Sequence, residues 1–227
     1  AWRRGSKDRG VPTRFVQDGF AVASLDFRLS GEAPFPAQIH DIKAGLRYLR
    51  ANAPELGFNA TRIAVVGASS GGHLAALVGV TNGDEGLEGE LGKHLEVSSD
   101  VHAVVSYFGA SNLTTILTQS TPHGLSVREP ALHLFLGGQP DEVPEIAHRA
   151  SPVFHVDADD PPLFLLHGDQ DPQMPINQSH ELEGAYAAEG LPVTFRVVHG
   201  AGHGTGEFLS DENYDPVVGF LRRVLGR

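Results

Sequence analysis

Short apolar runs alternate with helical patterns along most of the chain. Five runs read as strands, because they are almost wholly apolar and lie between clusters of Gly, Pro, Asn or Asp. The predicted strands cover residues 19–26, 62–66, 101–108, 162–167 and 192–198. The first run is expected to be buried on both faces of a sheet, because its apolar residues do not alternate with polar ones.

Helical patterns lie between these runs. The clearest begins at Pro36 and ends near Asn52, with apolar residues three and four positions apart. Further helices are predicted over residues 72–80, 131–136, 143–150, 176–189 and 217–225. Strands that alternate with helices favour an α/β fold with a doubly wound, mostly parallel sheet. In such a sheet, functional residues gather in the loops at the carboxyl ends of the strands.

The length of 227 residues fits one α/β domain that spans the whole chain, 1–227. Residues 112–156 are less regular than the rest, and we expect them to form a cap or insert over the site. Phe135 and Phe154 are candidate walls of an acyl pocket there, although core packing explains them equally well. Residues 83–99, rich in Gly and acid, read as a solvated surface loop.

The candidate nucleophile lies in the sequence Gly67-Ala68-Ser69-Ser70-Gly71, which matches G-x-S-x-G. It stands between an apolar strand and a helix, where a sharp turn lifts the central hydroxyl clear of the sheet and requires small residues at Gly67 and Gly71. The same turn directs the amide of Ser70 at an oxyanion. A phosphate-binding turn is the alternative, but neither Gly-rich phosphate motif is present. Ser69 is therefore preferred over the rival hydroxyl of Ser70.

A serine nucleophile needs a base and a carboxylate that orients it. Asp171 follows the fourth predicted strand and is held by a proline, whereas Asp169 is expected to cap its own turn. His203 follows the fifth strand between two glycines, whereas His199 is expected to bond locally. The order Ser69, Asp171, His203 is that of α/β-hydrolases. A metal site built from these loops is the alternative; no ligand motif supports it, so no metal and no cofactor are predicted.

Charge and composition narrow the partners. Lys and Arg total 17 against 28 Asp and Glu, a net charge of −11, which disfavours nucleic acid and anionic membrane surfaces and leaves a small-molecule ester as the expected partner. The chain has no cysteine, which excludes disulfides and thiolate catalysis. No apolar run approaches the roughly 18 residues of a membrane span. Both a cytoplasmic and an exported location fit these features.

Three motifs together resemble a known family. GASSGGHLAAL around Ser69, HGDQDPQMP around Asp171 and GAGHG around His203 resemble bacterial α/β-hydrolases of the feruloyl-esterase and acetylesterase-like group. This group stands near the hormone-sensitive-lipase-like esterases and the kynurenine formamidases. The resemblance implies the α/β-hydrolase fold and a serine carboxylesterase that acts on short-chain or small aryl esters through an acyl-enzyme. An arylformamidase, a small peptidase or a non-catalytic ligand-binding protein are the alternatives.

The resemblance also bears on residues around the expected triad. Members of the group carry an H-G-G-x-W segment, and Ala1-Trp2 resembles its end, so the N-terminal strands of the fold are expected to lie outside this sequence. It implies Ala1 as a second oxyanion donor beside Ser70, and Trp2 as a substrate contact. We also expect Phe108 to contact the substrate. Asn112 stands where the group often has Asp, so the contacts of that loop are expected to differ.

Overall fold

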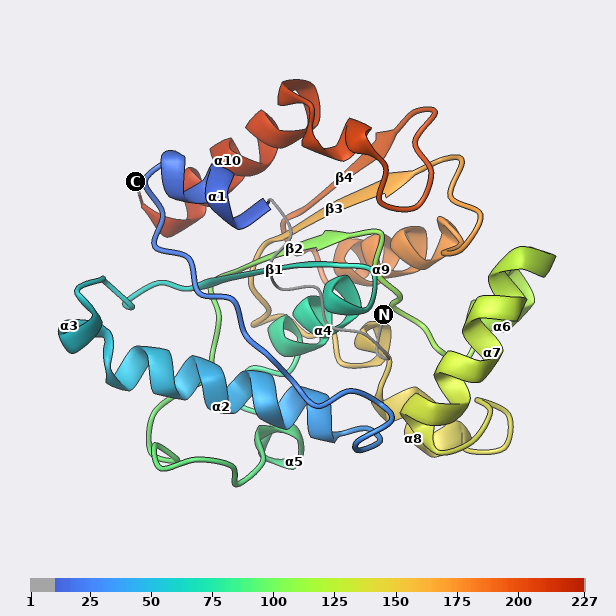
Figure 1. Ribbon diagram of the computed structural model, residues 1–227, viewed down its shortest axis with the longest axis horizontal. Coiled ribbons are helices and arrows are strands. Elements are labelled where there is room, and N and C mark those ends of the chain that lie inside the picture. The colour runs from blue at the N-terminus through green and yellow to red at the C-terminus, as the bar shows by residue number, and fades with distance from the viewer. Residues whose placement is uncertain (1–10, 227) are drawn as a thin grey trace.

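The computed structural model describes residues 11–226, and the strands within them form a four-stranded parallel sheet. The strands follow one another in the sheet as they do in the sequence: β1 (Ala64–Ala68), β2 (Ala103–Tyr107), β3 (Leu163–Gly168) and β4 (Val193–Val198). Parallel neighbours need a crossover connection between them, and helices cover both faces of the sheet. The α/β prediction of a doubly wound parallel sheet is confirmed (Figure 1).

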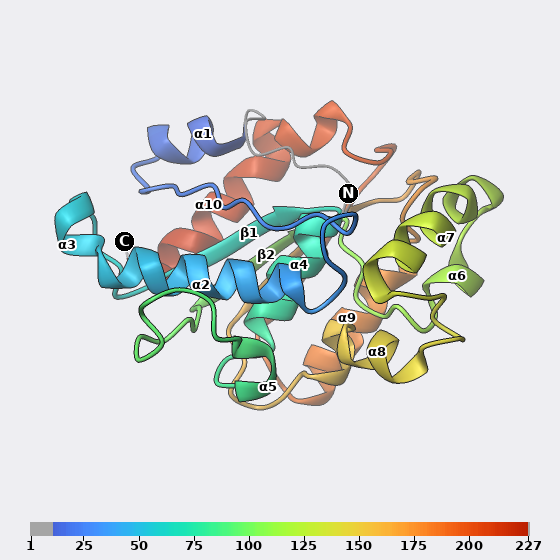
Figure 2. The same cartoon turned by 60° about the horizontal axis from the view of Figure 1, so that its bottom comes forward.

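The helices form two layers. On one face lie α2 (Ala37–Ala51), α4 (Ser70–Gly79) and α9 (Asn177–Ala188), and on the other lie α1 (Val11–Gln17) and α10 (Asp211–Leu225), as Figures 1 and 2 show. Each layer packs a hydrophobic core against the sheet: Val104 faces the first, whereas Ala103 and Val105 face the second. The central strands are therefore covered on both faces, which explains their continuous apolar sequences.

The remaining elements are short or lie outside these layers. They are α3 (Ala53–Leu56), α5 (Glu85–Glu88), α6 (Ile116–Gln119), α7 (Pro122–Leu136), α8 (Pro144–Arg149) and the 3₁₀ turns η1 (Pro152–Phe154) and η2 (Gly206–Leu209). The expected cap region thus contains α6, α7, α8 and η1, and its role as a cap stays a prediction. Within residues 11–226, no helix has both the length and the apolar character that crossing a bilayer requires.

The strand predicted over residues 19–26 is wrong. Residues 20–29 form neither helix nor strand, and residues 21–24 are exposed rather than buried on two faces. Within the described part of the chain, β1 is an edge strand that pairs with β2 alone, so no strand of the sheet adjoins this segment. An apolar run becomes a strand only where a neighbour supplies the backbone hydrogen bonds, and composition does not report the neighbour.

The other four strands lie within two residues of their predicted bounds, but two helices begin earlier than expected. Helix α7 begins at Pro122 rather than near residue 131, and the Thr121 side chain caps it by accepting a hydrogen bond from the Gly124 amide. Helix α10 begins at Asp211 rather than at residue 217. Both helices start with turns that lack the apolar spacing on which the prediction relied.

The segment 83–99 is more than the solvated loop expected. It contains α5, whose Leu87 is fully buried, and Glu88 pairs with two cations of α2. The Nζ of Lys43 lies 3.2 Å from Oε2 of Glu88, and the Arg47 guanidinium contacts the other carboxylate oxygen. Both cations are 1% exposed, and buried charges need a counterion. The ion pairs with Glu88 therefore hold this segment against α2.

Candidate active site

The register of the sheet brings four loops to one edge. Ala68 pairs with Tyr107, and Gly168 pairs with Val198, so neighbouring strands end at matching positions. The loops that follow carry the predicted site residues, and the strand ends point to the same side of the molecule in Figure 1. Parallel strands in this register place residues that are distant in the sequence within contact of one another.

Ser69 occupies a strained turn between β1 and α4. Its φ and ψ of 56° and −119° lie in a region that non-glycine residues rarely adopt, at a cost of about 1–3 kcal/mol. Its amide donates to the carbonyl of Tyr107 at 2.9 Å. A Cβ at position 67 would lie 2.0 Å from the Gly71 carbonyl oxygen, so glycine is required there. A Cβ at position 71 meets no described atom within 4 Å, so residues 11–226 give no steric reason for glycine there.

His203 lies between Ser69 and Asp171. Its Nδ1 lies 2.6 Å from Oδ2 of Asp171, and its Nε2 lies 3.0 Å from the Ser69 hydroxyl oxygen. Because a carboxylate only accepts, Nδ1 carries the proton and Nε2 accepts from the hydroxyl, which is the tautomer that a general base requires. The structure therefore joins the three predicted residues in one chain of hydrogen bonds.

Asp171 is almost fully buried, with 1% of its side chain exposed. Its Oδ1 accepts the amides of Gln173 and Met174, both at 2.8 Å, and its Oδ2 faces His203. Burial opposes ionisation, but hydrogen-bond donors of His167, His203 and the Met174 amide outweigh it and hold the pKa of the Asp171 carboxyl well below its usual range. The carboxylate is therefore ionised wherever the protein is folded near neutral pH.

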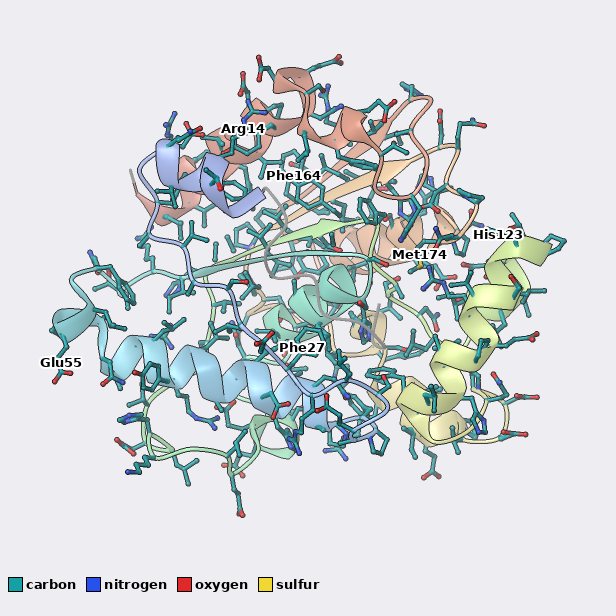
Figure 3. The ribbon with its side chains drawn as sticks, viewed as in Figure 1. Arg14, Phe27, Glu55, His123, Phe164 and Met174 are labelled. Atoms are coloured by element: carbon teal, nitrogen blue, oxygen red, sulfur yellow. The ribbon has the colours of Figure 1, made fainter. Side chains whose placement is uncertain are left out.

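His167 supports the turn that carries Asp171. It is fully buried, and its Nε2 donates to the carbonyl of Met174 at 3.0 Å while its Nδ1 accepts from the Ser179 hydroxyl at 2.7 Å. Nε2 also lies 3.6 Å from the Asp171 carboxylate. Met174, marked in Figure 3 near the start of α9, is thus bound on both its amide and its carbonyl. These contacts give His167 a structural role in the turn.

Asp169 does not act mainly on its own turn, as the sequence had suggested. Its Oδ2 lies 2.8 Å from Nδ1 of His199, and its Oδ1 accepts the Gly200 amide at 2.8 Å. The hydrogen bond with His199 lowers the pKa of Asp169 most, followed by that from Gly200. Asp169 therefore ties the loop after β3 to the loop after β4, which carries His203, and it is Asp171 that binds the amides of its own turn.

The second strained residue of this edge is Phe108. Its φ is 40°, which is unusual for a bulky side chain. The ring lies 4.7 Å from the His203 ring at an interplanar angle of 62°, and 4.8 Å from the Phe208 ring. Only 6% of Phe108 is exposed. Its predicted contact with substrate stays a prediction.

Of the two predicted oxyanion donors, Ser70 and Ala1, only Ser70 lies within the described residues. Ser70 is the first residue of α4, where an amide has no acceptor within the helix and adds to the positive end of the helix dipole. Its role as an oxyanion donor stays a prediction. Ala1 and Trp2, the other predicted donor and substrate contact, lie outside the described residues.

Thr121, which caps α7, and Arg128 of α7 bind the turn of Asp171, and sequence reasoning missed both. The Thr121 hydroxyl donates to the Pro172 carbonyl at 2.8 Å, and Nε of Arg128 donates to the Gln173 carbonyl at 3.2 Å. Arg128 is 4% exposed, and within the described residues its Nη2 has no partner. Burial lowers the pKa of Arg128 to about 10, although the charge of Asp171 opposes this shift. The sequence did offer a signal, because Arg128 is a charged residue at helical spacing from the apolar residues Ala131, Leu132 and Phe135.

The other residues singled out in the sequence have ordinary contacts. Phe135 is fully buried in the core, and Phe154 is 41% exposed and stacks on His148 at 3.8 Å. His73 is buried beside the Ala150 carbonyl, and burial lowers its pKa to about 4. Asn112, in place of the expected Asp, accepts from the amide and hydroxyl of Thr114.

The alternative metal site is not assembled by these residues. Asp169 pairs with His199, Asp171 pairs with His203, and His167 binds Ser179, so the candidates divide into separate contacts. Among residues 11–226 there is no group of three or more His, Cys, Asp or Glu placed to hold a metal ion.

Known proteins resemble this chain over most of its length. The BD-FAE family model matches residues 1–186. Esterase LipC of Mycobacterium tuberculosis (strain ATCC 25618 / H37Rv) is 31% identical over 208 residues, which cover 90% of this chain and 50% of LipC. The chain spans about half the length of the curated relatives it matches.

Solved structures share the fold. A truncated carbohydrate esterase from gut microbiota is 35% identical, with a TM-score of 0.83 over 90% of this chain and 74% of that one. An esterase from Thermogutta terrifontis, at 24% identity, shows the fold with a TM-score of 0.73 over 99% of this chain and 78% of its own. The chain therefore has the α/β-hydrolase fold and belongs to the BD-FAE family.

Proposed function

We propose that this protein is a serine esterase that hydrolyses carboxylic esters, with Ser69 as nucleophile, His203 as base and Asp171 as the residue that orients the base. The observation that carries the proposal is the unbroken chain of hydrogen bonds from Oδ2 of Asp171 through both ring nitrogens of His203 to the Ser69 hydroxyl. A strained strand-to-helix turn that presents the serine supports the same chemistry.

Acylation follows from the tautomer of His203. Its Nε2 takes the Ser69 proton as the hydroxyl oxygen adds to the ester carbonyl, and the Asp171 carboxylate stabilises the imidazolium that forms. The amide of Ser70 donates to the oxyanion of the tetrahedral intermediate. The intermediate then collapses, the bond to the alcohol oxygen breaks, and Nε2 returns the proton to the leaving alcohol.

Deacylation repeats these steps with water. Nε2 of His203 deprotonates the water that attacks the acyl-enzyme, and the proton then goes to the Ser69 oxygen as the acid leaves. One base therefore serves both halves of the reaction, because Asp171 holds its ring with Nε2 directed at the serine.

For the substrate we propose esters of short or small aryl acids with a carbohydrate alcohol. The motifs around Ser69, Asp171 and His203 support the small acyl group. The carbohydrate is supported by the carbohydrate esterase from gut microbiota, whose solved structure is 35% identical to this chain.

A substrate panel tests the proposal. The protein is assayed with p-nitrophenyl acetate and butyrate, acetylated xylo-oligosaccharides, formylkynurenine and a peptide anilide, beside Ser69→Ala as the control. We expect hydrolysis of the esters, with the acetylated sugar among them, and loss of activity in the control. Faster cleavage of formylkynurenine or of the anilide would contradict the ester assignment, and equal activity of the control would contradict the nucleophile.

A further inference from the structure

Phe108 contacts the proposed base rather than open space. Its ring and the His203 ring are 4.7 Å apart in an edge-to-face arrangement, which aromatic pairs favour. With 6% of the residue exposed, the ring has little surface left for a substrate. The Phe108 ring therefore packs against the His203 ring, where it can affect the orientation of the base.

His203 lies between two glycines, which give the backbone of its loop more conformational freedom than other residues would. Gly202 and Gly204 flank it, and Gly204 has a φ of 69°, a conformation that favours glycine. The hydrogen bonds of His203 to Asp171 and Ser69 hold its two ring nitrogens, and the hydrogen bond to Ser69 is given up each time the serine reacts. The Phe108 ring adds a contact that does not depend on the Ser69 hydroxyl.

The turn of Phe108 also contacts the nucleophile. The carbonyl of Tyr107 accepts the Ser69 amide at 2.9 Å, and close approaches at Gly72 and Gly109 bring α4 against the same turn. A Cβ at position 109 would lie 2.6 Å from the Gly72 carbonyl carbon. The Tyr107 carbonyl thus binds the Ser69 backbone, and the side chain of the next residue, Phe108, contacts His203.

We propose that Phe108 is a positioning residue, whose strained backbone directs its ring against His203 and thereby sets the distance between the base and the Ser69 hydroxyl. The Phe208 ring lies 4.8 Å from the Phe108 ring, and Phe208 follows His203 on η2, so Phe108 contacts both His203 and the segment that follows it. This inference rests on the proposed function and deepens it. It differs from the substrate contact predicted for Phe108 from the sequence, and the acyl-length series below distinguishes the two roles.

The test compares Phe108→Leu, Phe108→Tyr and Phe220→Leu. Phe220 is a matched control, because it is also buried in the α10 core, 4% exposed, but it contacts Phe164 rather than His203. Initial rates are measured for p-nitrophenyl esters of two, four and eight carbons. Folding is checked by thermal melting, and the His203 imidazole proton shared with Asp171 is followed by NMR.

We expect kcat of Phe108→Leu to fall roughly 10- to 100-fold, by the same factor for every acyl length, with KM little changed. The imidazole resonance should broaden, because the ring is no longer fixed. Phe108→Tyr, which keeps the ring, should retain kcat, as should Phe220→Leu. A loss that varies with acyl length, a raised KM, or an unchanged kcat would overturn the inference. Should Phe108→Leu fail to fold, loss of kcat in a folded Phe108→Tyr would overturn it.

The outcome for the wild-type protein separates this inference from the proposed function. If the wild type hydrolyses esters and Ser69→Ala does not, the proposed function stands, and the Phe108 variants test only the positioning role. If the wild type is inactive on every ester, the proposed function fails first.

Discussion

Asp171 binds His203 through only one of its two carboxylate oxygens. Oδ2 lies 2.6 Å from Nδ1 of His203, whereas Oδ1 accepts the amides of Gln173 and Met174. The backbone amides of the turn need a hydrogen-bond acceptor at Oδ1, and the Nδ1 proton of His203 needs one at Oδ2. A carboxylate has an acceptor oxygen at both positions, whereas a side-chain amide has only one.

Asp171→Asn should abolish most of the activity while leaving the fold intact. The loop amides fix the amide oxygen at the position of Oδ1, so the NH₂ group faces His203 and forces the proton onto Nε2, which then cannot accept from Ser69. We expect kcat to fall roughly 10⁴-fold, the cost of the wrong tautomer. Asp169→Asn, in the same turn but bonded to His199, is the matched control and should lose far less. A fall below tenfold in Asp171→Asn would be incompatible with this role.

Arg128→Met should separate activity from stability. Arg128 is a buried cation whose Nη2 has no hydrogen-bond partner among residues 11–226, so an apolar side chain of similar volume removes a buried charge that is incompletely compensated there. Its loss removes the donor to the Gln173 carbonyl and a positive charge near Asp171. We expect unfolding in urea to change by less than about 1 kcal/mol, whereas kcat falls several-fold.

Arg128→Lys serves as the conservative variant, since it keeps a cation and a donor. It should recover part of the kcat that Arg128→Met loses. If Arg128→Met unfolds the protein or keeps the wild-type kcat, the link between α7 and the Asp171 turn has no bearing on activity.

Glu88→Gln should destabilise the protein strongly, far from the site. The change leaves the buried charges of Lys43 and Arg47 without their carboxylate, and breaking a buried pair in this way costs about 3–5 kcal/mol. Chemical denaturation gives the loss directly. Glu90→Gln removes the same charge from an exposed position of the same segment, and it should change stability by less than about 0.5 kcal/mol. Equal effects of the two changes would contradict the ion-pair network.

Asp160→Asn should stabilise the protein in a pH-dependent way. Burial, with the charges of Asp157 and Asp159, raises the pKa of Asp160 to about 7, although a hydrogen bond from the Asp157 amide opposes the shift. The folded state therefore binds this proton more tightly than the unfolded state, whose carboxyl titrates near about 3.9. The stability that the protonated group contributes is complete below that value and is lost as the pH rises to about 7.

An amide at this position does not ionise and can still accept the Asp157 amide. Asp160→Asn should exceed the wild type by about 2–4 kcal/mol at about pH 8, and the difference should vanish near about pH 3.5. Urea titrations across this range measure it. A difference that is constant with pH would show that Asp160 does not titrate in this way.

The candidate site residues could be predicted from the sequence more easily than the residues around them. Ser69, Asp171 and His203 each lie in a short glycine-containing loop directly after an apolar strand, so local pattern and strand order were enough to nominate them. Phe108 and Arg128 contact residues far away in the sequence, His203 and Gln173. A positive φ or a hydrogen bond to a distant carbonyl leaves no local pattern, which is why their contacts appeared only in the structure.

The elements of the fold also differ in how well the sequence predicts them. The central strands β2 and β3 were predictable, because burial on both faces favours a continuous apolar run, whereas the edge strands β1 and β4 are only partly buried but still mostly apolar. Residues 19–26 have the same composition but no neighbouring strand among the described residues, so the same pattern predicted a strand that is not there. The choice between Asp169 and Asp171 rested on the reach of the side chains, yet the structure distinguishes the two by their partners.

The most direct test of the central claim is covalent labelling by a fluorophosphonate probe, followed by peptide mapping. The probe reacts with a serine only where a base activates the hydroxyl, so the geometry predicts one label, on Ser69, that persists in Ser70→Ala and disappears in Ser69→Ala. Labelling on Ser70, or no labelling of the folded protein, would contradict the account.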